Sequence, residues 1–423
     1  MRPCRFPLSR RIAVLAAVAS SSLSFATPPA PALPAPASIY TVKFERQPDA
    51  KTLTALGRTL FSERALSASG RMSCASCHDP AHAYAPANAR AVQLGGAGLA
   101  RPGLRAVPSL KYHQNLPPFQ EHFFDNDGND SEDQGPTGGL GWDGRADSTH
   151  EQAAAPLLSP FEMGNASVAD VVAKLKASAS AQAMRDALGP HVFDDPTLAW
   201  NGLVFALQVF QQSPADFYPY DSKYDAFLRH QAPLSPAELR GLAVFNDPAR
   251  GNCAACHVSA IKRGAFPQFT DYGLIAIGVP RNHAIPANAA AGYRDLGACG
   301  PLRTDLANRD EYCGLFRTPS LRNVARRGVY FHNGVYTRLA DAVRFYALRD
   351  SAPQRVYGAG KAHRFDDLPQ KYRANLNDAG PFGAKPGDRP SMTEAEIADV
   401  VAFLETLDDG YKVPAAAKLA AKN

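Results

Sequence analysis

The 423-residue chain places apolar residues at helical spacing over much of its length. Residues 168–178 and 198–212 repeat them every three or four positions between Gly and Pro residues, so each stretch predicts a helix. Residues 339–346 (LADAVRFY) follow the i, i+3, i+4, i+7 pattern, which predicts a helix whose apolar face ends in the phenol of Tyr346. Because no long stretch alternates apolar and polar residues, we expect few and short strands.

Two sequence signals mark helix starts. Ser235-Pro-Ala-Glu238 is a capping box with Pro at the first helical position. Ser391-Met-Thr-Glu394 has the form of a capping box and opens the helix predicted over residues 396–407. Both helices therefore have a defined first turn.

One sequence pattern occurs twice. Gly57, Leu60 and Phe61 recur with the same internal spacing as the Gly, Val and Phe of residues 241–245. Each copy lies a short way before a C-x-x-C-H sequence. An amphipathic helix that leads into such a sequence is how a small cytochrome domain begins, so the repeat predicts two of these domains.

The N-terminus has the pattern of a secretory signal peptide. The first 26 residues combine four arginines, an apolar run over residues 12–25 and a small-residue cleavage point near Ala26. A Pro/Ala-rich tether follows over residues 27–46. Because no later stretch of about 20 apolar residues exists, we expect a periplasmic protein without membrane insertion. The formal charge of +5 includes the leader's arginines, and no basic patch with interleaved aromatic residues indicates nucleic acid as a partner.

Four of the seven cysteines lie in two C-x-x-C-H motifs. In such a motif the two thiols attach to the vinyl groups of a haem, and the His supplies an axial nitrogen to the iron. The motifs predict two covalently bound haem c groups, held by Cys74, Cys77 and His78 and by Cys253, Cys256 and His257. A Cys4 zinc site and thioredoxin-like redox pairs are the alternatives, but neither needs a His after each pair, and an oxidising compartment disfavours free thiolates.

The other cysteines have simpler roles. Cys4 belongs to the leader. Cys299 and Cys313 predict a disulfide that closes a short loop and contributes about 2–3 kcal/mol to stability.

Together these features predict an all-α fold of two cytochrome c-like helical haem domains with long loops. The first domain is expected over residues 47–231 and the second over residues 232–412, followed by a tail at 413–423. The loops at 79–140 and 258–314 are expected to form lids and interdomain contacts.

Three longer motifs accompany the haem motifs in a fixed order: RAVPSL at 105–110, GWDGRADSTHEQAAAPLLSPFEMG at 141–164 and FRTPSLRNVARRGVYFHNG at 316–334. In these motifs the chain resembles the bacterial di-haem cytochrome c peroxidases, and among them the MauG-like, His/Tyr-ligated subgroup. The resemblance covers nearly all of the exported chain. It implies that hydrogen peroxide reacts at the N-terminal haem and that the C-terminal haem serves electron transfer.

The resemblance also implies catalytic residues beside the first haem. In the family a Gln and a Glu lie ten residues apart; here they are Gln152 and Glu162, with Pro156 between them shaping the pocket. A carboxylate can take a proton from peroxide and return it to the departing oxygen, while an amide orients the peroxide. Trp142 of the W-D-G-R sequence is implied to lie between the haems and to pass electrons, the alternative being a structural core residue.

The distal side of the first haem is expected to be open. Conventional peroxidases of the family close it in the resting state with a His from the loop after the haem motif. No His lies between residues 83 and 112, and His82 is too close to His78 to reach the opposite face. His113 and His122 are the nearby imidazoles that would change this expectation.

For the second haem, the resemblance implies a distal ligand fourteen residues after the His of Y-F-H-x-G. Counting from His332 gives Tyr346, where conventional members have Met and MauG-like members have Tyr. A phenolate favours oxidised iron, whereas a thioether favours reduced iron. We therefore expect an enzyme that stores oxidising equivalents on both haems without prior half-reduction. The alternative is a core Tyr whose hydroxyl bonds to a backbone group.

Calcium is a point of departure from the family. Relatives hold this ion between the haems partly through an Asn side chain, and the equivalent residue is Ala106. Backbone carbonyls near Arg327 and Val329 would be the remaining ligands, which argues against calcium in this chain.

The predicted function is an exported, MauG-like di-haem c-type peroxidase that reduces hydrogen peroxide. Its expected partner is a small electron donor, such as a cytochrome c or a cupredoxin, or a protein substrate whose side chains it oxidises. A conventional reduction-activated cytochrome c peroxidase and a non-catalytic di-haem electron carrier are the alternatives. The carrier would be expected to cap both irons.

Overall fold

The computed structural model describes residues 42–124, 133–262, 264–359 and 364–414. The predicted signal peptide, residues 27–41 of the tether and residues 415–423 of the tail lie outside the described residues.

Helices make up most of the regular structure. The first group is α1 (Ala50–Phe61), α2 (Cys74–Cys77), α3 (Thr149–Leu158), α4 (Val168–Ala177), α5 (Ala181–Leu188), α6 (Pro196–Gln211) and α7 (Pro214–Phe217). The second group is α8 (Lys223–Leu228), α9 (Pro236–Asn246), α10 (Leu339–Leu348), α11 (Pro353–Tyr357) and α12 (Glu394–Glu405). The helices predicted at 168–178, 198–212 and 339–346 are confirmed as α4, α6 and α10.

Strands are few and short, as expected, but they are present. β1 (Leu94–Gly95) pairs antiparallel with β2 (Arg101–Pro102), with Leu94 opposite Pro102. β3 (Leu274–Ile275) pairs antiparallel with β4 (Phe316–Arg317), with Ile275 opposite Phe316. The fold is therefore rich in helix, and the prediction of an all-α fold needs these two small sheets added.

The two predicted helix starts have different outcomes. Ser235 caps α9 as predicted: its hydroxyl accepts the Glu238 N–H at 3.3 Å, and the Glu238 carboxylate accepts the Ser235 N–H at 2.6 Å. The capping box proposed at Ser391 is wrong, because Thr393 and Glu396 form the box that opens α12. Both pairs match the capping pattern in sequence, so the pattern alone does not choose between them.

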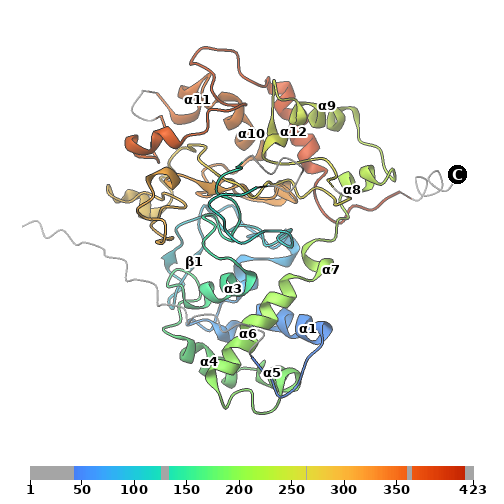
Figure 1. Cartoon of the computed structure of the whole chain (residues 1–423), viewed down its shortest axis with the longest axis vertical. Helices are drawn as coiled ribbons and strands as arrows, with labels where there is room; N and C mark the ends of the chain where they lie inside the picture. The colour runs from blue at the N-terminus through green and yellow to red at the C-terminus, as the bar shows by residue number, and fades with distance from the viewer. Residues whose placement is uncertain (1–41, 125–132, 263, 360–363, 415–423) are drawn as a thin grey trace, which may run out of the picture. The chain divides into compact units, whose positions relative to one another are not determined.

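The repeated Gly marks the closest helix contact in each half of the chain. Figure 1 shows α1 beside α6 and α9 beside α12. A Cβ at Gly57 would lie 2.0 Å from the carbonyl oxygen of Ala206 on α6, and a Cβ at Gly241 would lie 1.9 Å from that of Asp399 on α12. Both glycines let a helix backbone approach its partner directly, so the repeat in sequence is also a repeat in packing.

The two largest hydrophobic clusters follow the same division. One gathers buried residues between positions 53 and 217, and the other gathers buried residues between positions 224 and 407. Each cluster includes one copy of the paired helices, α1 with α6 or α9 with α12. These clusters agree with two packed regions along the chain, while the boundary at residues 231 and 232 stays a prediction.

Gly241→Ala is expected to lower the free energy of unfolding of the holoprotein by about 1–3 kcal/mol, because the added methyl group must push α9 away from α12. Chemical denaturation measures this change. Gly98→Ala is the matched control, since a Cβ at Gly98 meets no atom within 4 Å. Equal stability of the two variants would contradict the close helix contact.

Candidate functional site

A cavity in the first half of the chain, called the N-terminal cavity below, gathers the predicted peroxide site. The first C-x-x-C-H motif lines it, and so do all the residues predicted to act in catalysis. These residues are Cys74, Cys77, His78, Trp142, Gln152, Pro156 and Glu162. Residues up to 88 positions apart are therefore brought to one place, as the sequence predicted.

His78 is held as a neutral ring with one nitrogen free for a ligand. Its Nδ1–H donates to the carbonyl oxygen of Tyr84 at 3.1 Å, because a carbonyl can only accept. Burial lowers the pKa of His78 to about 4, so the ring carries no charge at neutral pH. The Nε2 atom is then the unprotonated nitrogen, which is the form that binds a metal.

Glu162 is fixed through its backbone. Its N–H donates to the Ser159 carbonyl oxygen at 3.0 Å, and its own carbonyl oxygen accepts the Gly96 N–H at 2.7 Å. Gly95 permits this contact, since a Cβ there would lie 2.2 Å from the carbonyl oxygen of Phe161. The short strand β1 therefore holds the loop that carries the carboxylate against the cavity.

The electrostatics of Glu162 suit proton exchange. The residue keeps solvent-accessible surface through the cavity, yet protein atoms crowd its carboxyl group. Burial raises the pKa of Glu162 above its usual value, although Ser159 and the positive charge of Arg145 oppose this effect. A carboxyl whose pKa is raised gains and loses a proton closer to neutral pH.

Helix α3 presents the other two residues. The Ser148 hydroxyl caps the helix by accepting the Glu151 N–H at 3.2 Å. This cap fixes the first turn of α3, and Gln152 is the next residue of the helix. Pro156 lies inside the helix and has no N–H to donate to the Gln152 carbonyl oxygen. The carbonyl oxygen of Pro156 accepts the N–H of Met163 at 3.1 Å, so the helix is tied to the loop that carries Glu162.

A second cavity, the C-terminal cavity, contains the other motif. Cys253, Cys256, His257 and Tyr346 all line it. The Nδ1–H of His257 donates to the carbonyl oxygen of Phe269 at 2.8 Å, and burial lowers the pKa of the ring. In His257, as in His78, the Nε2 atom is therefore the nitrogen that is left to bind a metal.

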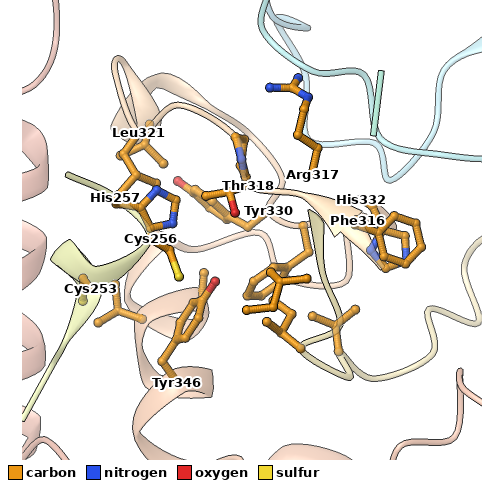
Figure 2. Close-up of a pocket in the computed structure, with 18 of the residues that line it drawn as sticks. Cys253, Cys256, His257, Phe316, Arg317, Thr318, Leu321, Tyr330, His332 and Tyr346 are labelled. Atoms are coloured by element: carbon orange, nitrogen blue, oxygen red, sulfur yellow. The ribbon is translucent and has the colours of Figure 1, made fainter. Parts of the chain in front are cut away.

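Tyr346 faces this cavity from α10. Figure 2 shows its hydroxyl and the His257 ring pointing into the same space beside Cys256. Its ring stacks on Phe382 with centroids 5.6 Å apart. Burial raises the pKa of Tyr346, so the phenol keeps its proton unless a cation replaces it. Packing on Phe382 fits the alternative of a core residue, whereas a hydroxyl that faces the same cavity as His257 fits the predicted ligand.

Trp142 and Pro108 line both cavities. Residues 105–108 with Trp142 are called the junction below. The Trp142 indole N–H donates to the carbonyl oxygen of Ala106 at 2.7 Å, and its ring lies edge-on to His332 with centroids 6.5 Å apart. Trp142 therefore lies in a wall that both cavities share, while its place between two haems stays a prediction.

The sequence prediction did not include the ionic residues that hold the junction. Arg105 binds Asp143 at 2.6 Å and Asp295 at 2.6 Å, and Asp143 is fully buried. Asp295 is 190 positions from Arg105 in the chain. No local sequence pattern indicates a pair so far apart in the chain. The signal that could have pointed to Arg105 is its place in the RAVPSL motif.

The other imidazoles near the first motif do not enter the N-terminal cavity. Among the residues that the structure describes, His78 is the imidazole that lines it. His113 lines the C-terminal cavity. His122 is exposed and pairs with Asp133 at 2.6 Å.

A zinc site does not fit the cysteines. The two C-x-x-C pairs line different cavities, so they cannot form one Cys4 zinc site. Within the described ranges, no group of three or more His, Cys, Asp or Glu side chains is arranged to hold a metal ion. The four motif cysteines are not joined in disulfides, and Cys299 and Cys313 form the predicted disulfide. Two cysteines, the imidazole of the motif and largely apolar walls fit a haem in each cavity.

A helical chain with two C-x-x-C-H cavities has the features of a di-haem c-type protein. Comparison with known proteins agrees: the family model for di-haem cytochrome c peroxidase matches residues 51–233. The chain belongs to the di-haem cytochrome c peroxidase family, and it is therefore a haem-dependent oxidoreductase.

Individual relatives cover most of the chain. It is 34% identical over 387 residues to the methylamine utilization protein MauG of Paracoccus denitrificans, covering 86% of this chain and 90% of that protein. It is 29% identical to cytochrome c551 peroxidase of Pseudomonas aeruginosa, covering 76% and 82% of the two chains. The crystal structure of the diheme peroxidase BthA from Burkholderia thailandensis superimposes with a TM-score of 0.77 at 39% identity, covering 88% and 90%.

None of the helices in the described part of the chain has the length and apolar character needed to cross a bilayer.

Proposed function

We propose that this protein is an exported, MauG-like di-haem peroxidase that reduces hydrogen peroxide at the N-terminal haem and stores oxidising equivalents on both haems. The observation that carries the proposal is the difference between the two cavities. The N-terminal cavity is lined by a carboxyl and an amide together with the imidazole of its motif, whereas the C-terminal cavity is lined by the phenol of Tyr346 together with the imidazole of its motif.

The chain's own residues would hold the two haems. Cys74 and Cys77 would bind one porphyrin and Cys253 and Cys256 the other, with the Nε2 atoms of the two motif histidines as axial ligands. When bound, haem supplies the iron that peroxide oxidises by two electrons.

Around the N-terminal site, the side chains move protons and orient peroxide. The Glu162 carboxylate accepts a proton from one peroxide oxygen and returns it to the departing oxygen, so that water leaves. The Gln152 amide donates to or accepts from peroxide and fixes its direction. Pro156 keeps the helix and the Glu162 loop in register through its bond to Met163.

Trp142 is the proposed route for electrons between the two sites. Its indole lies in the wall shared by both cavities, and the bond to Ala106 holds its orientation. A large polarisable ring shortens the gap that an electron must cross, which suits a protein that spreads oxidation over two centres.

The test of this function is an optical titration of the fully ferric holoprotein with hydrogen peroxide. We expect about one equivalent of peroxide to change the absorption of both haems without a reductant. A conventional peroxidase would respond only after half-reduction, and an electron carrier would not respond. Either of these results would overturn the proposal.

Tyr346→Phe is expected to abolish the low-spin ferric signal of the C-terminal haem in electron paramagnetic resonance, because the phenyl ring has no oxygen to bind iron. Met392→Leu is the matched control, since Met392 is buried and lines the same cavity, and a thioether is the competing ligand. Loss of the signal in Met392→Leu and its survival in Tyr346→Phe would reverse the ligand assignment.

The partner and the compartment belong to the proposal as well. Electrons come from a small donor protein, or from side chains of a protein substrate, and steady turnover with reduced cytochrome c separates the first case from the second. Export predicts that protein recovered from the periplasm begins just after Ala26. Protein recovered with its leader from the cytoplasm would contradict export.

A further inference from the structure

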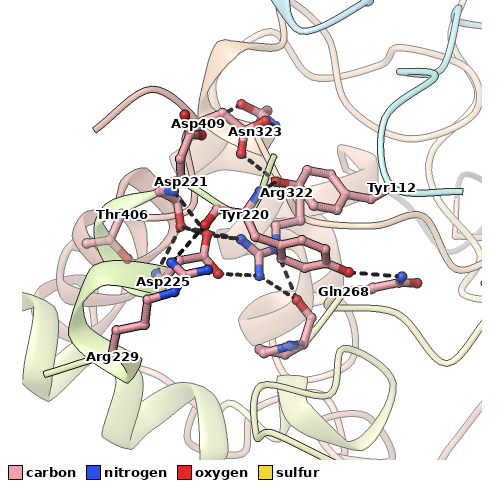
Figure 3. Close-up of polar contacts among 12 residues, drawn as sticks. Tyr112, Tyr220, Asp221, Asp225, Arg229, Gln268, Arg322, Asn323, Thr406 and Asp409 are labelled. Carbon is pink, nitrogen blue, oxygen red and sulfur yellow. Dashed lines mark hydrogen bonds and ion pairs between the residues drawn. The ribbon is translucent and has the colours of Figure 1, made fainter. Parts of the chain in front are cut away.

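Deeply buried arginines in this protein are paired with acids. Their side chains are at most 8% exposed, and each lies 2.5–2.8 Å from a carboxylate oxygen: Arg105 with Asp143, Arg281 with Asp367, Arg303 with Asp305, Arg322 with Asp225 and Arg349 with Asp350. Figure 3 shows one of these pairs, Arg322 with Asp225. The pairing is expected, because an isolated buried charge costs several kcal/mol.

Arg317 breaks this rule, and Arg327, which is partly buried, also lacks an acid partner among the described residues. Neither forms an ion pair with a carboxylate in the part of the chain that the structure describes. Arg317 is 4% exposed; its Nε donates to the Gly141 carbonyl oxygen at 3.1 Å, and its Nη1 is buried without a partner. Arg327 donates from Nε to the Val329 carbonyl oxygen at 3.3 Å and from Nη2 to that of Val107 at 3.2 Å.

Both guanidinium groups remain cations despite burial. Burial lowers the pKa of each to about 10, which is still well above neutral. The charge of Asp143 reaches Arg317, but Asp143 is already bound by Arg105. Among the residues that the structure describes, these two positive charges therefore have no carboxylate of their own.

These charges border the junction between the cavities. Both residues line the C-terminal cavity. Arg317 bonds to the residue before Trp142, and Arg327 bonds to Val107, which precedes Pro108. Since Trp142 and Pro108 line both cavities, the unpaired cations lie at the wall that the two sites share.

A bound haem would supply the missing acids. If its vinyl groups were attached to the cysteines, its two propionates would lie toward the side of the cavity away from them. In Figure 2, Cys253 and Cys256 lie at one side of the cavity, and Arg317 lies on the other side and points away from them. A propionate carboxylate matches the charge, the forked shape and the buried setting of a guanidinium group.

We infer that Arg317 and Arg327 bind haem propionates at the junction. Their positive charges balance the propionate charges there, in place of a divalent cation. This inference rests on the proposed function only for the presence of the two haems. It assigns a ligand to two residues that otherwise have no role in the site.

The junction does not fit a calcium ion. Ala106 has no side-chain oxygen, and its carbonyl oxygen accepts the indole N–H of Trp142. The carbonyl oxygen of Val329 accepts from Arg327, and the carbonyl oxygen of Arg327 accepts the Tyr330 hydroxyl at 3.1 Å. Each of these carbonyl oxygens already accepts one donor of the chain, and residue 106 adds no side-chain oxygen, so the junction is a poor site for calcium.

The first test measures the midpoint potentials of the haems in the holoprotein by spectroelectrochemistry. Arg317→Gln and Arg327→Gln keep hydrogen bonding but remove the charge, so the potential of at least the C-terminal haem should fall, because a nearby cation favours the reduced iron. Arg317→Lys and Arg327→Lys should recover part of the shift. Arg326→Gln is the control, since Arg326 is the exposed neighbour and pairs with Asp408. Wild-type potentials in both Gln variants would overturn the inference.

The second test needs no variant and stands if the Gln variants do not load haem. Metal analysis of the wild-type holoprotein should find substoichiometric calcium, and a calcium chelator should leave both potentials unchanged. One calcium per chain, whose removal shifts a potential, would overturn the inference. Both tests are made without peroxide, so their outcome is independent of whether the protein turns over peroxide.

Discussion

Glu162→Gln is expected to slow the reaction of the ferric holoprotein with hydrogen peroxide by about 10²–10⁴-fold. The amide has nearly the shape of the carboxylate, but it cannot accept a proton from peroxide. Stopped-flow absorption of the haems measures the second-order rate constant. Glu405→Gln, which changes an exposed carboxylate on α12, is the control and should react at the wild-type rate.

The pH dependence of the same reaction gives a second readout. Burial raises the pKa of Glu162, and the carboxylate is the form that accepts the proton. The wild-type rate constant should therefore decline as pH falls through a pKa above the usual glutamate value, and this decline should be absent in Glu162→Gln. A wild-type rate constant in the variant, with the acid decline intact, would remove Glu162 from the chemistry.

Arg105→Gln is expected to lower the free energy of unfolding of the holoprotein by about 3–5 kcal/mol. The substitution leaves two carboxylates, of Asp143 and Asp295, buried at the junction without their main cation. Urea denaturation at neutral pH measures the loss. Arg240→Gln is the control, because that side chain is 61% exposed and its bridge to Asp399 is expected to contribute less than about 1 kcal/mol.

The sign of the pH effect distinguishes this cause from simple loss of packing. Burial alone would raise the pKa of Asp143, but Arg105 and Arg145 hold it below its usual value in the wild type. The Arg105–Asp143 pair therefore stabilises the fold fully at pH values above the pKa of Asp143 in the unfolded chain. This stabilisation is lost as pH falls through the lower pKa of the folded protein. Without Arg105 the pKa of Asp143 should rise, so Asp143 becomes protonated at a higher pH and no longer carries an unpaired buried charge. The difference in the free energy of unfolding between the wild type and Arg105→Gln should therefore become smaller at lower pH. A difference that does not change with pH would indicate packing instead.

Helices and the residues of each cavity were predictable because their signals are local. The 3.6-residue period located α4, α6 and α10, and the spacing of C-x-x-C-H fixed which thiols and imidazole share a cavity. The 141–164 motif placed Gln152 and Glu162 together because one helix and one turn join them. Their catalytic roles and the iron ligands stay predictions.

Features that depend on contacts between distant residues were not predictable. The bond from Arg105 to Asp295 spans 190 positions, and either residue alone resembles an ordinary surface charge. Arg327 stands next to Arg326 in the sequence, yet one reaches the junction and the other pairs with Asp408 at the surface. The start of α12 was not predictable either, because two overlapping capping patterns occur in the sequence and Thr393 is the cap that forms.

The central claim is that the two irons differ, one open to peroxide and the other closed by Tyr346. The electron paramagnetic resonance spectrum of the resting ferric holoprotein tests it most directly. The account predicts one high-spin signal from the N-terminal haem and one low-spin signal from the C-terminal haem. Two low-spin signals would mean that both irons are capped, and they would contradict the account.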